Sequence, residues 1–362
     1  MKRIRAAFLA FSAFIVNMAS ASDGCVELLF VGDAMQHQAQ LDKAKEIGSK
    51  SYDYSGCFAY IAPEIQAADY AVVNLEVPLG GGPDYSGFPN FSAPDSYAKA
   101  LKDAGFDLFL TANNHCLDRK DKAARRTLTA LENMGVDVIG TFQNADDREK
   151  KVPLLKNIDG INFGFLNYTY GTNGIDPVAG AEVALIDKEK MAEEIRRTRE
   201  AGAEIIVVAM HWGLEYMMLP TKNQEDLAQF LIDNGVDLII GSHPHVIQPM
   251  KVVHNPKEDK DVLVVYSLGN FISNMRTADT RGGALVRARI KRDSQGRAKF
   301  ESADYDTFMT AKPSGGTTNF RVVPSWMSDK IPSSQKEDWV LFNRGSSRVL
   351  DENNVGVPRK HK

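Results

Sequence analysis

The sequence is poor in cysteine and in clustered positive charge, and both shortages narrow the functions open to it. It has 3 cysteines in 362 residues, so at most one disulfide can form within the chain. In an exported protein we expect Cys25 and Cys57 to form that bond. Cys116 fits a small buried thiol, because a zinc ligand would have a second cysteine nearby. The net charge of −4 and the lack of a long basic run predict no nucleic-acid partner, but they leave room for a groove that binds a polyanion.

Long hydrophobic runs are also scarce, and the one near the N-terminus is too short to cross a bilayer. Basic residues precede an apolar stretch at residues 6–16, and small residues follow it. This pattern predicts a signal peptide at residues 1–21, with the mature chain beginning at Ser22. The alternative is an uncleaved membrane anchor, whereas lipid attachment at Cys25 lacks the preceding aliphatic residue that it requires. We therefore expect an exported protein, periplasmic or extracellular, with membrane association as the alternative.

Short apolar runs alternate with stretches of helical periodicity along the rest of the chain. Eight runs predict strands at residues 26–31, 70–73, 108–111, 136–139, 161–167, 205–210, 238–240 and 262–266. Four stretches, each followed by a glycine, predict helices at residues 95–104, 122–134, 187–201 and 223–234. The alternation predicts an α/β fold with a layered sheet. We assign residues 22–311 to one domain and residues 312–362 to a partly irregular extension whose last twenty residues are mobile.

Polar residues gather directly after the predicted strands, where α/β sheets bind their ligands. The segments are GDAMQH, NLE, ANNHCLD, HWG and GSHPH, and they hold five of the 7 histidines. Carboxylate, amide and imidazole groups together suit Zn, Mn or Fe, and such a metal can generate hydroxide at neutral pH. The sequence therefore predicts a metal centre whose candidate ligands are Asp33, His37, Glu76, Asn114, His211, His243 and His245.

Four members of this set also have an ordinary structural explanation. Asp33 fits a helix cap or a tight turn, Glu76 a surface acid and Asn114 a left-handed turn. His211 fits a hydrogen-bonded core histidine. The His-Pro-His segment at 243–245 is more specific, because alternate residues of an extended segment project on the same side and the proline stiffens the spacer. The residues taken jointly favour the metal centre.

The same phrases resemble the bacterial capsule synthesis CapA family, which is associated with poly-γ-glutamate capsules and is related to calcineurin-like metallophosphoesterases. The resemblance extends from about residue 27 to beyond Asn270. It rests on GDAMQH, VVNLEVPL, FPNFSAPDS, FDLFLTANNHCLDR, HWGLEY, GSHPHVIQP and VYSLGNF, in that order. It implies a metallophosphoesterase-like β-sheet sandwich flanked by helices, with one or two divalent metals drawn from Mn, Fe and Zn.

The resemblance also implies how the ligands divide between two metals. Asp33 is similar to the ligand on the first strand, and His245 would join it on one metal. Asn114 resembles the ligand asparagine, and it would share the other metal with His211 and His243.

Two positions depart from the phosphoesterase pattern. Met35 stands where the first motif has a histidine, and methionine is a poor ligand for hard metals. Either His37 fills that position or it stays open and only one metal binds well. Glu76 stands where the family of phosphoesterases has a bridging aspartate, and its longer side chain would change the metal spacing.

Further residues have expected roles around the metals. His115 resembles the outer histidine that protonates a leaving group, and Asp118 is close enough in sequence to orient it. We expect Asn113 and Trp212 to contact substrate. Asn270 is expected to bond to backbone behind the site.

Two functions are consistent with these residues and motifs. The first is an exported metal-dependent hydrolase of phosphoesterase type, whose partner is a capsule or cell-envelope polymer of poly-γ-glutamate type or its precursor. The second is a non-catalytic component that binds the polymer within membrane-bound capsule machinery, and Met35 favours it. The sequence has no synthetase-type nucleotide loop, so we expect polymerisation itself to belong to another protein.

Overall fold

The computed structural model describes residues 24–48, 51–315 and 318–361. The predicted signal peptide and Ser22 lie outside these residues. Within the described ranges, no helix is both long and apolar enough to cross a membrane.

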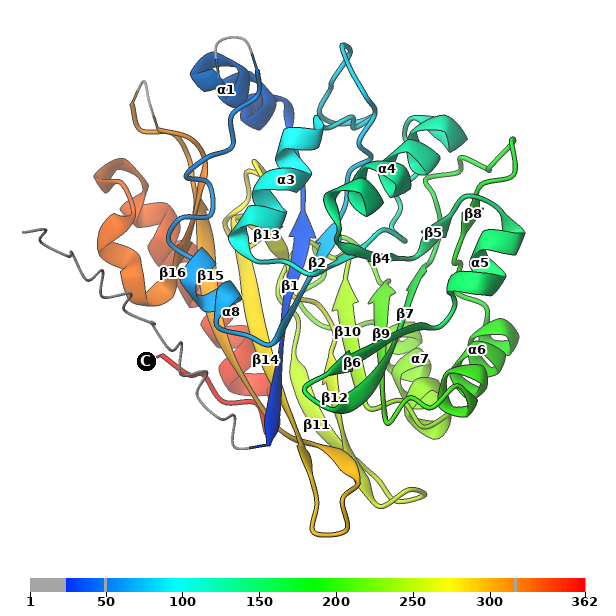
Figure 1. The fold of residues 1–362 in the computed structure, drawn as a ribbon. Coiled ribbons are helices and arrows are strands. Elements are labelled where there is room, and N and C mark those ends of the chain that lie inside the picture. The colour runs from blue at the N-terminus through cyan, green and yellow to red at the C-terminus, as the bar shows by residue number, and fades with distance from the viewer. Residues whose placement is uncertain (1–23, 49–50, 316–317, 362) are drawn as a thin grey trace, which may run out of the picture.

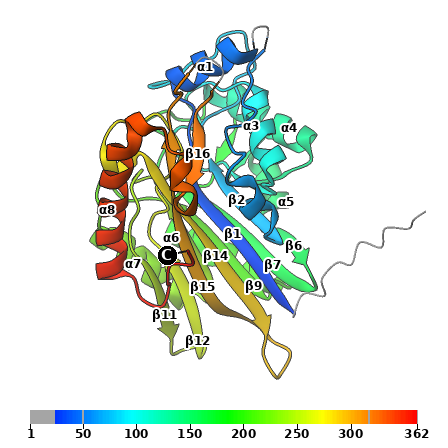
Figure 2. The ribbon, with the colours of Figure 1, turned by 90° about the vertical axis from the view of Figure 1, so that its left-hand side faces the viewer.

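Two β-sheets pack face to face, and helices cover their outer faces (Figures 1 and 2). The larger sheet has 8 strands in the order β16-β15-β14-β1-β2-β3-β4, with β13 also paired to β1. Its parallel strands are β1 (Cys25–Ala34), β2 (Tyr70–Leu75), β3 (Leu108–Leu110), β4 (Asp137–Ile139) and β13 (Asn270–Ile272). Its antiparallel strands are β14 (Gly282–Arg292), β15 (Ala298–Ala311) and β16 (Arg321–Pro324).

The second sheet has 6 strands in the order β11-β12-β10-β9-β7-β6. Its parallel centre consists of β7 (Ile161–Thr169), β9 (Ile205–His211), β10 (Leu238–Ser242) and β12 (Lys260–Val265). Two antiparallel edge strands are β6 (Leu154–Ile158) and β11 (Met250–Asn255). A separate two-stranded sheet pairs β5 (Thr141–Phe142) with β8 (Glu182–Val183).

The predicted helices are present, and the α/β sheet sandwich flanked by helices is confirmed. They are α3 (Asp95–Ala104), α4 (Lys120–Met134), α6 (Lys188–Glu200) and α7 (Lys222–Asp233). Gly105 and Gly135 cap α3 and α4 in the left-handed conformation, as expected for glycine. Four helices were not predicted from the sequence, namely α1 (Gln38–Gly48), α2 (Ala62–Gln66), α5 (Ala145–Lys151) and α8 (Lys336–Asn353).

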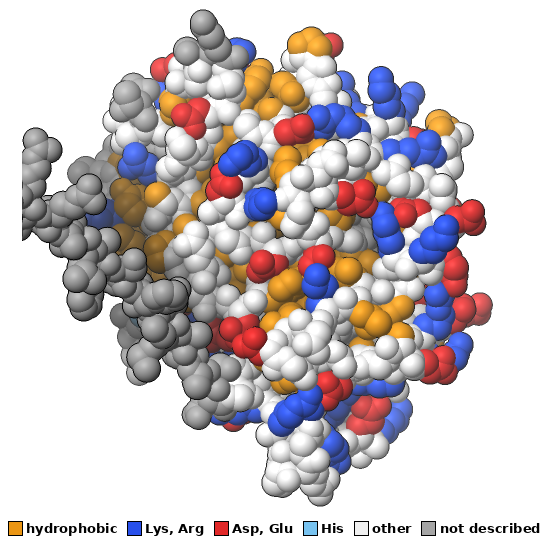
Figure 3. Space-filling view, in the orientation of Figure 1, with side chains coloured by type: hydrophobic (Ala, Val, Ile, Leu, Met, Phe, Trp, Pro, Cys, Tyr) orange, Lys and Arg blue, Asp and Glu red, His pale blue; other side chains and the backbone are white. Residues whose placement is uncertain are grey.

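The alternation of side chains along β1 explains why the larger sheet is buried on both faces. Leu28 and Phe30 point into the core between the two sheets. Leu29 and Val31 point to the other face, where they join a second core that includes Leu101 of α3. On the surface, acidic and basic side chains are interspersed over the face drawn in Figure 3.

The C-terminal segment is more ordered than we expected. β16 extends the larger sheet and α8 packs against β15, so residues after 312 continue the same structure. Beyond α8, the backbone of Tyr305 bonds to Pro358 and Lys360. The described part of the last twenty residues thus gives no support to the expectation of mobility, because α8 and backbone pairing with β15 hold the tail.

The tail also meets a buried ionic group that we call the arginine cluster. Arg287, with no exposed surface, donates to Glu64, Asp304 and Asp306 at 2.6, 2.6 and 2.9 Å. His361 lies 2.8 Å from Asp306 through Nδ1, so the end of the described chain closes one side of the cluster.

The predicted disulfide is wrong, because Cys25, Cys57 and Cys116 are all free. Cys25 begins β1 and is opposite Lys291 of β14. Lys291 is in turn opposite a residue near the start of β15. The carbonyl of Cys57 accepts from Val322, which pairs near the opposite end of β15. The two thiols therefore lie at opposite ends of the larger sheet, beyond the reach of a disulfide. The buried state expected for Cys116 is confirmed.

Candidate metal centre

The carboxyl ends of the central strands of both sheets meet at one end of the molecule. Figure 1 shows the arrowheads of β1, β2, β9 and β10 directed toward that end. Asp33 on β1 is opposite Asn74 on β2 and Asn270 on β13. His211 on β9 is opposite Ser242 on β10. The predicted strand-end residues are therefore brought together by parallel pairing within two different sheets.

Asp33 is fully buried and densely hydrogen-bonded. Its Oδ1 accepts from the Asn74 amide at 2.7 Å, and its Oδ2 lies 3.3 Å from the backbone nitrogen of His243 and 3.2 Å from Nδ1 of His245. Burial alone would raise its pKa, but the bonds and charges of His245, His211 and Asn74 lower the pKa to about 2. Asp33 is therefore an anion held in place by its neighbours.

Glu76 lies where the two sheets meet and has no exposed surface. Neither carboxylate oxygen has a hydrogen-bond partner among the described residues. Its Oε1 is 3.5 Å from Nε2 of His211 and 3.9 Å from Nε2 of His245. Burial, followed by the charge of Asp33, raises the pKa of Glu76 well above its usual value. Such an orphaned carboxylate is costly unless a cation or a proton compensates it.

The histidine segment reaches the site with a backbone conformation that the sequence did not predict. His243 and His245 have φ values of 100° and 58°, so the expected extended conformation is wrong. Two left-handed residues cost roughly 1–3 kcal/mol each, a strain that is typical of functional sites. Nδ1 of His243 is buried without a partner in the described ranges, and burial followed by the His245 charge lowers its pKa to about 4.

Side chains in the centre form two groups that share Glu76. In each group the potential ligand atoms lie within 4.8 Å of one another. One group contains Glu76, His211 and His243, and the other contains Asp33, Glu76 and His245. Asn114 adjoins the first group, because its Oδ1 is 2.8 Å from Nε2 of His211. This division matches the one that the resemblance implied, and the nitrogen and oxygen donors fit a divalent transition metal.

His37 does not join either group. Its Nδ1 accepts from the backbone nitrogen of Asn274 at 3.2 Å, and its ring lies edge-on to Phe91. Met35, at the position of the missing histidine, is buried in the core beneath the helices. The structure therefore gives no support to His37 as a replacement ligand, because the loop after β13 binds its ring.

His115 and Asp118 form the expected pair. Nδ1 of His115 is 2.8 Å from Oδ2 of Asp118, which also accepts from the backbone nitrogen of Phe91. The Phe91 ring packs edge-on against the imidazole with centroids 4.7 Å apart. The carboxylate and the ring fix the orientation of His115 and leave Nε2 outside the pair.

The two residues expected to contact substrate are buried and bonded within the protein. Asn113 is fully buried and donates to the carbonyl of Leu75 at 2.9 Å. Trp212 is 1% exposed and donates through Nε1 to the carbonyl of Tyr266 at 2.9 Å. Gly241 permits this packing, since a β-carbon there would overlap Tyr266 and the indole nitrogen. The structure therefore does not support a substrate contact at either residue, because each side chain is buried and its polar group bonds to backbone.

The role expected for Asn270 is confirmed. Its amide donates to the carbonyls of His245 at 3.3 Å and Thr280 at 2.9 Å, and its oxygen lies 3.0 Å from Nδ1 of His245. Asn270 therefore fixes the ring and the backbone of one candidate ligand.

Three further residues of the centre, Asn74, Ser242 and Tyr170, were not predicted from the sequence. Asn74 and Ser242 hold Asp33 and His211, and Ser242 lies 3.0 Å from Nδ1 of His211. The Tyr170 ring lies 4.6 Å from that of His243 and is 48% exposed. The sequence does hold a signal for Tyr170, because this residue directly follows β7, at the strand end where site residues gather. The predicted strand ends at residue 167, whereas β7 continues to Thr169.

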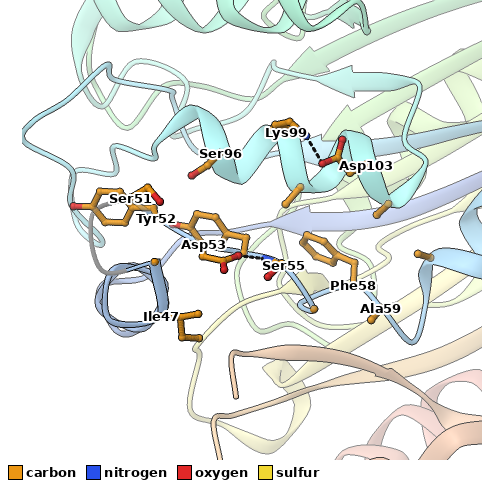
Figure 4. Close-up of a pocket in the computed structure, with 16 residues that line it drawn as sticks. Ile47, Ser51, Tyr52, Asp53, Ser55, Phe58, Ala59, Ser96, Lys99 and Asp103 are labelled. Carbon is orange, nitrogen blue, oxygen red and sulfur yellow. Dashed lines mark hydrogen bonds and ion pairs between the residues drawn. The ribbon is translucent and has the colours of Figure 1, made fainter. Parts of the chain in front are cut away.

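A pocket of about 560 Å³ lies elsewhere, between the 51–59 loop and α3 (Figure 4). Its charged side chains include Lys99 and Asp103, which pair with each other. None of the described residues that line it is a histidine. It offers no set of metal ligands comparable to the centre described above.

These observations define a layered α/β protein with a buried carboxylate and histidine centre where its two sheets meet. The chain belongs to the family described as bacterial capsule synthesis protein PGA_cap, whose model matches residues 27–275. This confirms the family that the sequence motifs suggested.

Two relatives are named for capsule or PGA biosynthesis. The PGA biosynthesis protein CapA of Bacillus subtilis (strain 168) is 29% identical over 296 residues, which is 78% of this chain and 72% of the relative. The capsule biosynthesis protein CapA of Bacillus anthracis is 29% identical over 274 residues, which is 73% of this chain and 64% of the relative. Among solved structures, the calcineurin-like phosphoesterase YfkN from Bacillus subtilis matches with a TM-score of 0.44 and 12% identity, covering 91% of this chain and 98% of that one.

Proposed function

We propose that the chain is an exported metal-dependent hydrolase of phosphoesterase type that acts in the synthesis of a capsule or another cell-envelope polymer. The observation that carries this proposal is Glu76, a fully buried carboxylate with no hydrogen-bond partner in the described part of the chain. A protein retains such a group where a ligand compensates it. Family membership supports the link to the capsule.

The proposed cofactor is one or two divalent ions drawn from Mn, Fe and Zn. Glu76 would be shared by both, with Asp33 and His245 holding one and His211, His243 and Asn114 the other. When bound, such ions supply a nucleophilic hydroxide at neutral pH and neutralise charge on a phosphoryl oxygen.

The chain's own catalytic contribution would come from His115. Asp118 accepts from Nδ1, stabilises the imidazolium and leaves a proton held at Nε2. That proton would pass to the oxygen of the leaving group as its bond to the reacting centre breaks. Asp118 positions the ring and does not itself react.

The proposed substrate is a cell-envelope polymer, of poly-γ-glutamate type, or its precursor. The name of the Bacillus subtilis relative supports this class, and membrane-bound capsule machinery is the proposed partner. Export is proposed from the pattern of residues 1–21.

The metal content of the purified full-length chain tests the proposal. We expect near-stoichiometric Mn, Fe or Zn in the wild type, a large loss in Glu76→Gln and His243→Ala, and chelator-sensitive hydrolysis of p-nitrophenyl phosphate. His254→Ala is the matched control, because this exposed histidine pairs with Asp261 on the edge of the second sheet. Metal that binds equally to all four proteins, or to none after reconstitution, contradicts the proposal.

A second candidate is a polymer-binding component without turnover. Met35 favours it, because its buried side chain leaves the group of Asp33, Glu76 and His245 without a further histidine ligand. Stoichiometric metal with no hydrolysis of any phosphate ester would support this function over the first.

A further inference from the structure

A pocket of about 450 Å³ lies beside the metal centre, and neither the family nor the proposed catalytic residues account for it. This volume suits a small ligand or one segment of a polymer. We name it the side pocket. It is lined by His37, Phe88, Tyr216, Asn274, Met275, Arg276, Thr277 and Thr280.

The side pocket is joined to the metal centre through Asn270. The amide of Asn270 donates to Thr280, which lines the pocket, and to the backbone of His245, a candidate ligand. The Tyr216 ring lies 6.4 Å from the His245 ring. A substrate with its reacting group at the metals could therefore extend into this pocket.

Positive charge dominates the loop after β13. Arg276 is exposed, and its guanidinium has no ion pair or hydrogen bond to any described residue. Arg281 nearby is matched by Asp338. Burial, followed by the neighbouring Arg281 and Arg276, lowers the pKa of Lys312. The charge of Arg276 is therefore left uncompensated at the pocket wall.

Two acidic residues of the neighbouring segments, Asp279 and Glu215, form no ion pair with Arg276 in the described part of the chain and interact with other groups. The carboxylate of Asp279 is directed to Gly345 of α8, where an added β-carbon would overlap it. Glu215 adjoins Tyr216, and its hydrogen bond and charge contribute, after burial, to raising the pKa of Tyr216 to about 12. An anion would therefore be favoured next to Arg276 and repelled by Glu215 next to Tyr216.

The walls of the pocket are aromatic and apolar. Phe88 is 71% exposed and Tyr216 is 52% exposed, although large aromatic side chains are usually covered. Exposed rings close to a site commonly form contacts with ligand. Together with Met275 they offer a surface on which methylene groups could pack.

We propose that the side pocket binds an oxyanion carried on a flexible aliphatic chain, with Arg276 binding the oxyanion and Phe88 and Tyr216 packing against the chain. A carboxylate and a phosphate share this chemistry. That the bound ligand also reaches the metals rests on the proposed function. Binding of the oxyanion in the pocket does not depend on it.

Calorimetric titration of the full chain tests the proposal. The carboxylate probe is a γ-linked glutamate tetramer, with the γ-linked glutamine tetramer as its uncharged match, and the phosphate probe is a glycerol phosphate trimer. Arg276→Ala should weaken binding of one anionic probe about tenfold, the loss of one charge-assisted pair. Arg276→Lys should recover part of it. Arg196→Ala, an exposed arginine on α6, is the matched control and should bind like the wild type.

The outcomes separate this proposal from the hydrolase. If Arg276→Ala weakens binding of the glutamate tetramer alone, the pocket is assigned to carboxylates. If it weakens binding of the glycerol phosphate trimer alone, the pocket is assigned to phosphates. The same loss in a Glu76→Gln background supports the pocket even if the metal centre proves absent. Equal binding by the wild type and Arg276→Ala, no preference over the glutamine tetramer, or no binding at all would overturn it.

Discussion

The arginine cluster and the candidate metal centre are both buried polar groups, yet the hydrogen bonding of Arg287 in the first and of Glu76 in the second is opposite. In the cluster, Arg287 meets three carboxylates, and Lys360, Arg289 and His361 bind the same acids from outside. In the candidate metal centre, neither the carboxylate oxygens of Glu76 nor Nδ1 of His243 have a hydrogen-bond partner among the described residues. Burial alone therefore does not distinguish structure from function in this chain. The distinction comes from whether each donor and acceptor is already used.

The difference also bears on how each region should respond to mutation. Removing one partner from a satisfied ionic network leaves uncompensated charges in a medium of low polarity. Removing an unsatisfied group relieves a cost that the fold already bears. Mutations in the two regions should therefore change stability in opposite directions while no metal is present.

The largest expected effect is in the arginine cluster. Arg287→Met should lower the free energy of unfolding by about 3–5 kcal/mol, because Asp304 and Asp306 lose their buried partner. Chemical denaturation at pH 7 measures it. Arg289→Met is the matched control, since this arginine also pairs with Asp304 but is 27% exposed, and it should cost about 1 kcal/mol or less. Equal losses in the two variants would contradict the comparison.

A smaller effect of opposite sign is expected in the chelated protein. Glu76→Gln should raise the free energy of unfolding by about 1–2 kcal/mol, because the neutral amide removes repulsion with Asp33. Glu194→Gln is the matched control, since Glu194 is equally a buried glutamate but binds Arg148 and Tyr168. It should destabilise the protein.

Adding metal should reverse the order of stability, so that the wild type becomes more stable than Glu76→Gln. Only the wild type gains stability from binding, by an amount that grows with metal concentration. Thermal unfolding with and without chelator measures the reversal. A destabilised Glu76→Gln in chelator would mean that Glu76 has an unrecognised structural partner.

The sequence predicted the grouping of the candidate metal ligands better than it predicted their surroundings, for a physical reason. Parallel strands bring their carboxyl ends together, so Asp33 and His211 could be grouped from their position after apolar runs. Trp212 follows the same strand but its indole turns to the backbone of Tyr266, which no local pattern reveals. The prediction of a disulfide between Cys25 and Cys57 was wrong for a similar reason, because it depends on where two distant segments lie on one sheet.

Strands β14 and β15 could not be predicted because charge interrupts their apolar pattern. Arg287 and Asp304 are opposite each other in register, and both side chains are largely buried. In sequence each looks like a solvent-exposed position. Only the pairing of the strands shows that they neutralise each other.

The smallest expected effect is the pH dependence of the arginine cluster through Glu64. Burial alone would raise its pKa, but Lys360 and Arg287 lower it below the usual 4.5. The unfolded chain therefore takes up a proton at Glu64 before the folded chain does as the pH falls. The resulting stability is complete above pH 4.5 and is lost as the pH falls through the lowered folded value.

Glu64→Gln should accordingly cost less than about 1 kcal/mol at pH 7, because solvent screens this partly exposed carboxylate. The difference from the wild type should shrink as the pH falls below 4.5. Urea unfolding at several pH values measures it, with the exposed Glu200→Gln as the control. A difference that is independent of pH would mean that Glu64 contributes through packing, and the contrast between the two clusters would then rest on Arg287 and the aspartates alone.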